Sequence, residues 1–158
     1  TGDHMIAFTE MHYMMALVHD GRLEAAQKLL DSLHAFAETP NNFAAGAMKD
    51  VGNQTCEAIL AYGKGQYGEA IDLMLPIRST YARVGASHAQ RDIFAQFLID
   101  AAQKDGQLKL ARTLLSERIE MFPQNVAAWN SYADTLSGLG DAAAAEAARE
   151  KAAHMLAA

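Results

Sequence analysis

The feature that most constrains the fold is a short pattern that recurs four times along the chain. Each copy has a glycine, then a large residue two positions on and an alanine five positions on, although the last copy lacks the large residue. The copies are Gly21-Leu23-Ala26, Gly65-Tyr67-Ala70, Gly106-Leu108-Ala111 and Gly140-Ala142-Ala145. Glycine suits a tight turn with positive φ between two helices, and alanine lets two helices cross closely. The pattern therefore predicts a series of helical hairpins.

The last copy sits within a longer motif that identifies the type of repeat. Four residues fall at the spacing of the tetratricopeptide consensus, namely Trp129, Ala133, Gly140 and Ala145. Successive turn glycines are 44, 41 and 34 residues apart, and the last interval equals the standard period. We therefore expect an all-α fold of about four tetratricopeptide-like repeats, forming a right-handed superhelix.

Eight helices are expected, two in each repeat. The first of each pair, the A helix, covers residues 5–19, 46–63, 88–105 and 125–139. The second, the B helix, covers residues 22–38, 66–84, 107–121 and 141–156. Pro76 falls inside the second B helix and should bend it, because proline lacks an N–H and crowds the preceding turn. Residues 1–158 are expected to form a single repeat domain.

Composition limits the classes of partner. Apolar residues make up 51% of the chain, which is enough to form a core, and the net charge is −6 with a pI of about 5.4. An acidic chain without a lysine or arginine stripe repels a phosphate backbone, so no nucleic-acid partner is expected. The chain has no apolar run of about 18 residues and no basic-then-apolar leader. We expect a soluble, cytoplasmic protein that does not bind membranes.

The first helix is apolar on almost every side. Met11, Met14 and Met15 belong to this surface. A helix of this kind needs cover on more than one face. An upstream repeat or a partner subunit is expected to supply it, so self-association through this helix is a possible mode of assembly.

Residues 85–92 are the best candidate for a binding segment. Ser87 and Gln90 have the spacing of a capping box, and Gly85 suits the end of the preceding helix. His88, Arg91 and Asp92 would then lie near the start of a helix, where free N–H groups favour an anion. A ligand site and a structural ion pair are both consistent with this pattern.

Other polar residues have simpler interpretations. His12 lies in the methionine-rich helix, where a histidine is more often a hydrogen-bonded core residue than a ligand. Cys56 is the single cysteine, which excludes an internal disulfide, and it fits a small core residue in the middle of a helix. The sequence contains no His-Glu-x-x-His motif and no phosphate-binding loop. No catalytic residues, metal ligands or cofactor are therefore predicted.

Three segments resemble one known family, the tetratricopeptide-repeat protein 38 family, also called StaR-like. Residues 8–16 resemble its Phe-x-Asp-x-His-x-x-Met-Ala segment, residues 85–92 its Gly-Gly-Ser-x-Ala-Gln-Arg-Asp motif, and residues 111–118 its Ala-Arg-x-Leu-x-x-Glu-Arg helix. The resemblance covers most of residues 8–122. It departs from the family at Ala86, which replaces a glycine, and at Glu10, which replaces an aspartate.

The resemblance implies a repeat superhelix and a chain that corresponds to the C-terminal third of the family's longer members. It implies no established reaction. The departure at Ala86 makes the turn less permissive, and the departure at Glu10 gives any carboxylate near His12 a longer reach.

Two classes of function are consistent with the sequence. A non-catalytic binding or scaffold module would present a groove of A helices to a peptide or protein. The residues expected to line this groove are Thr55, Ile59, Tyr62, Gln96, Asp100, Lys104, Asn130 and Asp134. The alternative is a small-molecule or enzymatic site between repeats, built from His12, His88, Arg91 and Asp92.

Overall fold

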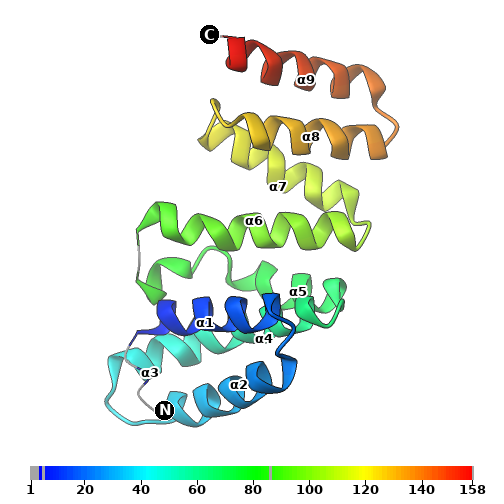
Figure 1. The fold of residues 1–158 in the computed structure, drawn as a ribbon. Coiled ribbons are helices and arrows are strands. Elements are labelled where there is room, and N and C mark those ends of the chain that lie inside the picture. Colours follow the sequence, from blue (N-terminus) through cyan, green and yellow to red (C-terminus); the bar gives the residue numbers. More distant parts are fainter. Residues whose placement is uncertain (1–3, 5, 86, 158) are drawn as a thin grey trace. The chain divides into compact units, whose positions relative to one another are not determined.

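The computed structural model of the chain describes residues 4, 6–85 and 87–157, with the backbone alone for 88–90 and 157 (Figure 1). Every regular element in these ranges is helical and none is a strand, which confirms the all-α prediction. No helix among the described residues is both long enough and apolar enough to cross a membrane.

The helices follow the expected order along the chain. They are α1 (Ala7–His19), α2 (Leu23–Ala37), α3 (Phe43–Ala47), α4 (Asn53–Gly63), α5 (Tyr67–Met74), α6 (His88–Lys104), α7 (Leu108–Met121), α8 (Val126–Gly138) and α9 (Ala142–Ala157). A π-helical turn, Met48–Gly52, joins α3 to α4, and two short 3-10 turns, Leu75–Ile77 and Tyr81–Val84, follow α5. Each of the eight predicted helices has a helical counterpart in the described ranges, although the bounds differ and residues 78–80 of the predicted helix 66–84 form a turn.

The recurring glycine and alanine have the roles that their spacing predicts. The four turn glycines have φ values of 71°, 77°, 76° and 82°, in the left-handed region. The alanines at the fifth position of the pattern, Ala26, Ala70, Ala111 and Ala145, are all fully buried. Both predictions are confirmed, because each turn uses a conformation that favours glycine and each helix start packs through a small side chain.

The second hairpin differs from the prediction at both ends. Its A helix begins at Phe43 rather than at 46, because the Asn42 side chain accepts a hydrogen bond from the Ala45 N–H at 3.1 Å and caps the first turn. Its B helix ends instead of bending: α5 stops at Met74, and Pro76 lies in a 3-10 turn. Proline removes one helical hydrogen bond and crowds the carbonyl four residues back, which ends the α-helix here.

The chain divides into two compact units, Thr1–Ala101 and Ala102–Ala158, and α6 runs through the boundary. In the first unit α1 packs on both α2 and α4 (Figure 1). Met11 and Met14 are fully buried in this packing, whereas Met15 is half-buried and Tyr13 is exposed. The methionine face is therefore covered largely within the chain. Self-association through the remaining surface of α1 stays a prediction.

The second unit is the helical array α7–α9. Consecutive helices pack together, and the chain reverses after Met121 and again at Gly140, as expected for residues 107–156. Ala133, Leu136, Ala145 and Ala148 form the core between α8 and α9. Trp129 packs at the edge of this core, and its indole N–H donates to the Pro123 carbonyl at 2.9 Å.

Replacing Ala145 by Leu should destabilise the chain by about 1–3 kcal/mol, because extra methylenes cannot fit where α9 crosses α8. The free energy of unfolding from urea titration measures the effect. Ala143→Leu is the matched control, since Ala143 is exposed on the same helix and should change stability little. Equal stability of the two variants would show that Ala145 is not at a close crossing.

Candidate functional site

A hollow of about 410 Å³ lies on the A helices of the first unit, and we call it the A-helix hollow. Its described lining residues all lie on α1, α4 and α6, which are A helices. The lining residues are Met15, Ala16, Val18, His19, Ile59, Tyr62 and Phe97. The volume lies in the range of small ligand pockets, and most of the lining is apolar.

Tyr62 is the residue that organises one wall of the hollow. Its ring centroid lies 4.3 Å from that of Phe97 and 5.1 Å from that of Tyr67. Its hydroxyl donates a hydrogen bond to the Asp100 carboxylate. These contacts hold the ring in one orientation, so the hollow has a shaped aromatic wall rather than a loose side chain.

The predicted groove residues of the first unit do not all reach this surface. Ile59 and Tyr62 line the hollow. Asp100 is half-buried and does not line it, but its carboxylate accepts the hydrogen bond from the Tyr62 hydroxyl. Thr55 is fully buried, and its hydroxyl donates to the Val51 carbonyl at 2.8 Å, so it offers no surface to a ligand. Gln96 is exposed and donates to the Asp92 carboxylate at 2.8 Å, one turn back on α6.

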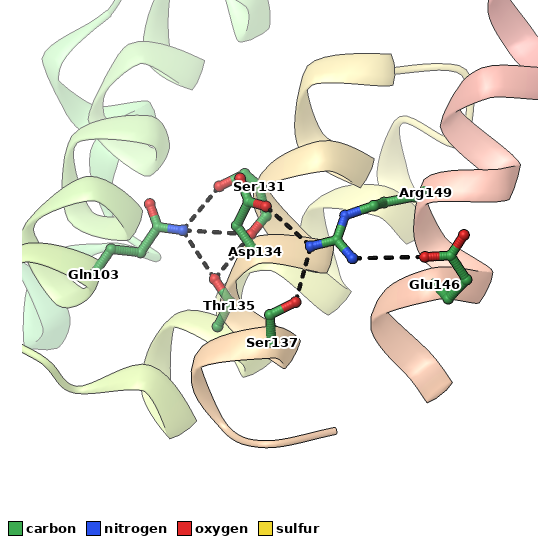
Figure 2. Close-up of polar contacts among 7 residues, drawn as sticks. All are labelled: Gln103, Ser131, Asp134, Thr135, Ser137, Glu146 and Arg149. Carbon is green, nitrogen blue, oxygen red and sulfur yellow. Dashed lines mark hydrogen bonds and ion pairs between the residues drawn. The ribbon is translucent and has the colours of Figure 1, made fainter. Parts of the chain in front are cut away.

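Three predicted groove residues belong to the second unit, and all three are exposed: Lys104, Asn130 and Asp134. Asp134 lies beside α9, where Arg149 approaches its carboxylate at 3.5 Å and donates to the Ser137 hydroxyl at 2.9 Å (Figure 2). Asn130 is exposed on α8. The Arg149 contact ties Asp134 to the neighbouring B helix, so this residue contributes to the packing of the hairpin.

A second polar cluster in the same unit provides hydrogen-bond partners for the buried hydroxyl of Thr135. The Gln103 amide donates to the hydroxyls of Ser131 and Thr135, each at 2.9 Å (Figure 2). Thr135 is almost fully buried and donates in turn to the Ser131 carbonyl at 2.9 Å. Each group therefore has a partner, which is the arrangement of a structural network rather than of a binding site.

The segment 85–92 begins a helix as predicted. The Ser87 carbonyl accepts from the Arg91 N–H at 3.0 Å, which places Ser87 at the N-cap position of α6. The Arg91 guanidinium donates to the Gly85 carbonyl at 3.2 Å. Ala86 and the side chain of His88 lie outside the described residues, so the proposed ligand role of His88 stays a prediction.

His12 has the contacts of a core histidine. Its Nδ1 lies 2.8 Å from the Phe8 carbonyl, which can only accept, so Nδ1 donates. Its ring packs against Phe8 at 4.1 Å and Phe94 at 6.3 Å between centroids. The small-molecule site considered from the sequence, with His12, His88, Arg91 and Asp92, stays a prediction.

One polar cluster has no counterpart in the sequence predictions. His4 Nδ1 lies 3.2 Å from the Glu10 carboxylate, and His4 Nε2 lies 2.8 Å from the Ser32 hydroxyl. The resemblance aligns Glu10 with an aspartate close in sequence to His12, whereas the structure pairs the Glu10 carboxylate with His4. No motif could have revealed this cluster, because Ser32 is 28 residues from His4 and lies on a different helix.

Within the described residues, no three of the metal-binding side chains His, Cys, Asp and Glu lie close enough together to hold a metal ion. Cys56 is fully buried. Burial raises the pKa of its thiol well above the ordinary value, and the negative charges of Glu10 and Glu57 raise it further. A buried thiol that resists ionisation is a core residue and not a nucleophile.

No protein-family model matches the chain, and no solved structure matches it with statistical significance. Function is therefore inferred from the geometry of the chain itself.

Cys56 should resist a thiol reagent in the native state and react fully once the chain is unfolded, because only the thiolate reacts and burial suppresses it. Colour release from DTNB, with and without concentrated guanidinium chloride, measures this. The sequence contains one cysteine, so the signal has a single source. Rapid reaction of the native chain would place Cys56 at the surface and contradict the described packing.

Proposed function

We propose that this chain is a helical-repeat binding module, and that the A-helix hollow receives an apolar side chain from an extended peptide or protein segment. The observation that carries the proposal is the origin of the lining, which comes from A helices alone. In a tetratricopeptide superhelix, the A helices face the concave surface on which extended segments bind. The resemblance to the tetratricopeptide-repeat protein 38 family supports the same type of architecture.

The chemistry of the lining favours one kind of contact. Met15, Val18 and Phe97 offer apolar surface, and methionine adapts to side chains of different shape. None of the described lining residues is a lysine or arginine, the side chains that would hold a free C-terminal carboxylate. We therefore infer that the bound segment is internal to its protein and is anchored by a Leu, Met or Phe side chain.

The test uses peptides selected on the whole chain from a random phage-displayed library. The variant Ala16→Leu fills the hollow from α1, where Ala16 is exposed and lines it. Fluorescence anisotropy should show at least tenfold weaker peptide binding to this variant, which corresponds to about 1.4 kcal/mol. Replacing the apolar anchor of the peptide by alanine should weaken binding to a similar extent.

Ala35→Leu is the matched control, because Ala35 is an exposed alanine on the B helix α2 and the same substitution there leaves the hollow open. Its peptide affinity should equal that of the original chain. Peptides that bind the Ala16→Leu variant with unchanged affinity would place their site elsewhere. A selection that yields no binding peptide would count against a peptide-binding module.

A further inference from the structure

The cluster of Ser32, His4 and Glu10 is separate from the A-helix hollow and plays no part in the proposed peptide binding. Ser32 lies on α2, Glu10 lies on α1, and His4 precedes α1. Both ring nitrogens of His4 are occupied, Nδ1 by the Glu10 carboxylate at 3.2 Å and Nε2 by the Ser32 hydroxyl at 2.8 Å. A hydroxyl, an imidazole and a carboxylate are thus connected in series.

The direction of the hydrogen bonds follows from what each group can do. An ionised carboxylate only accepts, so Nδ1 of a neutral His4 carries the proton and donates to Glu10. Nε2 then has a lone pair and no proton, so the Ser32 O–H donates to it. This is the polarity needed to remove a proton from a serine, with the base oriented by a third group.

Burial differs among the three residues in a way that suits this role. The side chains of His4 and Glu10 are only 5% and 8% exposed, whereas Ser32 is half-buried. A serine in the middle of a helix can bond back to a carbonyl of its own helix, but the Ser32 hydroxyl here contacts a histidine from outside α2. The base and the carboxylate that positions it are shielded from water, whereas Ser32 is partly exposed.

We propose that Ser32 is a nucleophile that takes an acyl group from small apolar esters, with His4 as its general base and Glu10 as the residue that positions His4. Phe36 supports the apolar preference. It lies one turn beyond Ser32 on α2 and is half-buried, and its ring centroid is 5.3 Å from that of His4. Phe36 thus places an apolar ring beside the general base, which favours an apolar acyl group.

In the acylation step, Ser32 Oγ attacks the ester carbonyl carbon and its proton passes to His4 Nε2. The imidazolium that forms is stabilised by Glu10. The bond from the carbonyl carbon to the leaving alcohol breaks, and the alcohol takes the proton from His4 as it departs. Water then repeats the sequence: it gives a proton to His4 and attacks the acyl carbon, and Ser32 recovers the proton as the carboxylic acid leaves.

The position of Ser32 also limits the rate of acylation. It lies in the interior of α2, where backbone N–H groups bond to carbonyls within the helix. They are not available to stabilise the oxyanion, a contribution worth roughly 100- to 1,000-fold in rate. Acylation should therefore require an activated leaving group, and the acyl form should accumulate.

The experiment treats the complete chain with a fluorophosphonate, from which Ser32 Oγ would displace fluoride as its proton passes to His4. Mass spectrometry after trypsin digestion locates the adduct, because the peptide 29–49 contains Ser32 as its only serine. We expect an adduct on this peptide in the native chain and none after unfolding in guanidinium chloride. Ser116 serves as the internal control, since it is an exposed serine in the interior of α7.

Variants separate the roles. Ser32→Ala should abolish the adduct on peptide 29–49, and His4→Ala should slow labelling by about 100-fold or more, the usual effect of losing a general base. Glu10→Gln keeps the size of the side chain and should slow labelling while the thermal midpoint shows that the chain remains folded. Release of p-nitrophenol from p-nitrophenyl butyrate should show a burst that Ser32→Ala removes.

The comparison of native and unfolded chains does not depend on any variant folding. If the native chain labels Ser32 no faster than Ser116, or no faster than the unfolded chain does, Ser32 is not activated and the proposal fails. If labelling persists unchanged in His4→Ala, the proposed base is wrong. Neither outcome bears on peptide binding at the A-helix hollow, which is measured separately.

Discussion

The close crossing of helices through a fully buried alanine is the contact on which the rest of the structure depends. A fully buried alanine follows each of the four turn glycines with positive φ by five residues, at Ala26, Ala70, Ala111 and Ala145, and the helices of the hairpins α1–α2, α4–α5 and α8–α9 pack together. The glycine reverses the chain tightly enough for the second helix to return along the first. The alanine then lets the two axes approach, so larger side chains on either side pack together.

Because the glycine turn and the buried alanine set the hairpin, the other core side chains can differ from one hairpin to the next. In the second unit the core is mainly alanine and leucine, with Trp129 at its edge. In the first unit the methionines of α1 fill the space against α2 and α4. Met11 and Met14 are fully buried, α1 also contacts the π-helical turn Met48–Gly52, and an unbranched side chain adapts well to such irregular surroundings.

The first unit contains two regions of different chemistry. The A-helix hollow is lined mostly by apolar residues and has one oriented aromatic wall, which suits recognition of an apolar side chain. The cluster of His4, Glu10 and Ser32 is polar and largely buried, and each ring nitrogen of His4 has a partner. A buried charge is tolerated only when it is paired, so the burial of the Glu10 carboxylate depends on its contact with His4.

The sequence by itself determined the fold class, the places of the helices and the turns between them. These follow from local rules: glycine at positive φ and apolar spacing along a helix. The extent of the second hairpin was less predictable, because the Asn42 cap and the π-helical turn lengthen its A helix without a periodic signal. Only the tertiary structure decided which polar residues meet. Glu10 lies two residues from His12 in the sequence but pairs with His4, and Thr55 lies on the α4 helix that lines the hollow but is fully buried. Such contacts depend on how separate helices approach each other, and spacing along one helix contains no information about that distance.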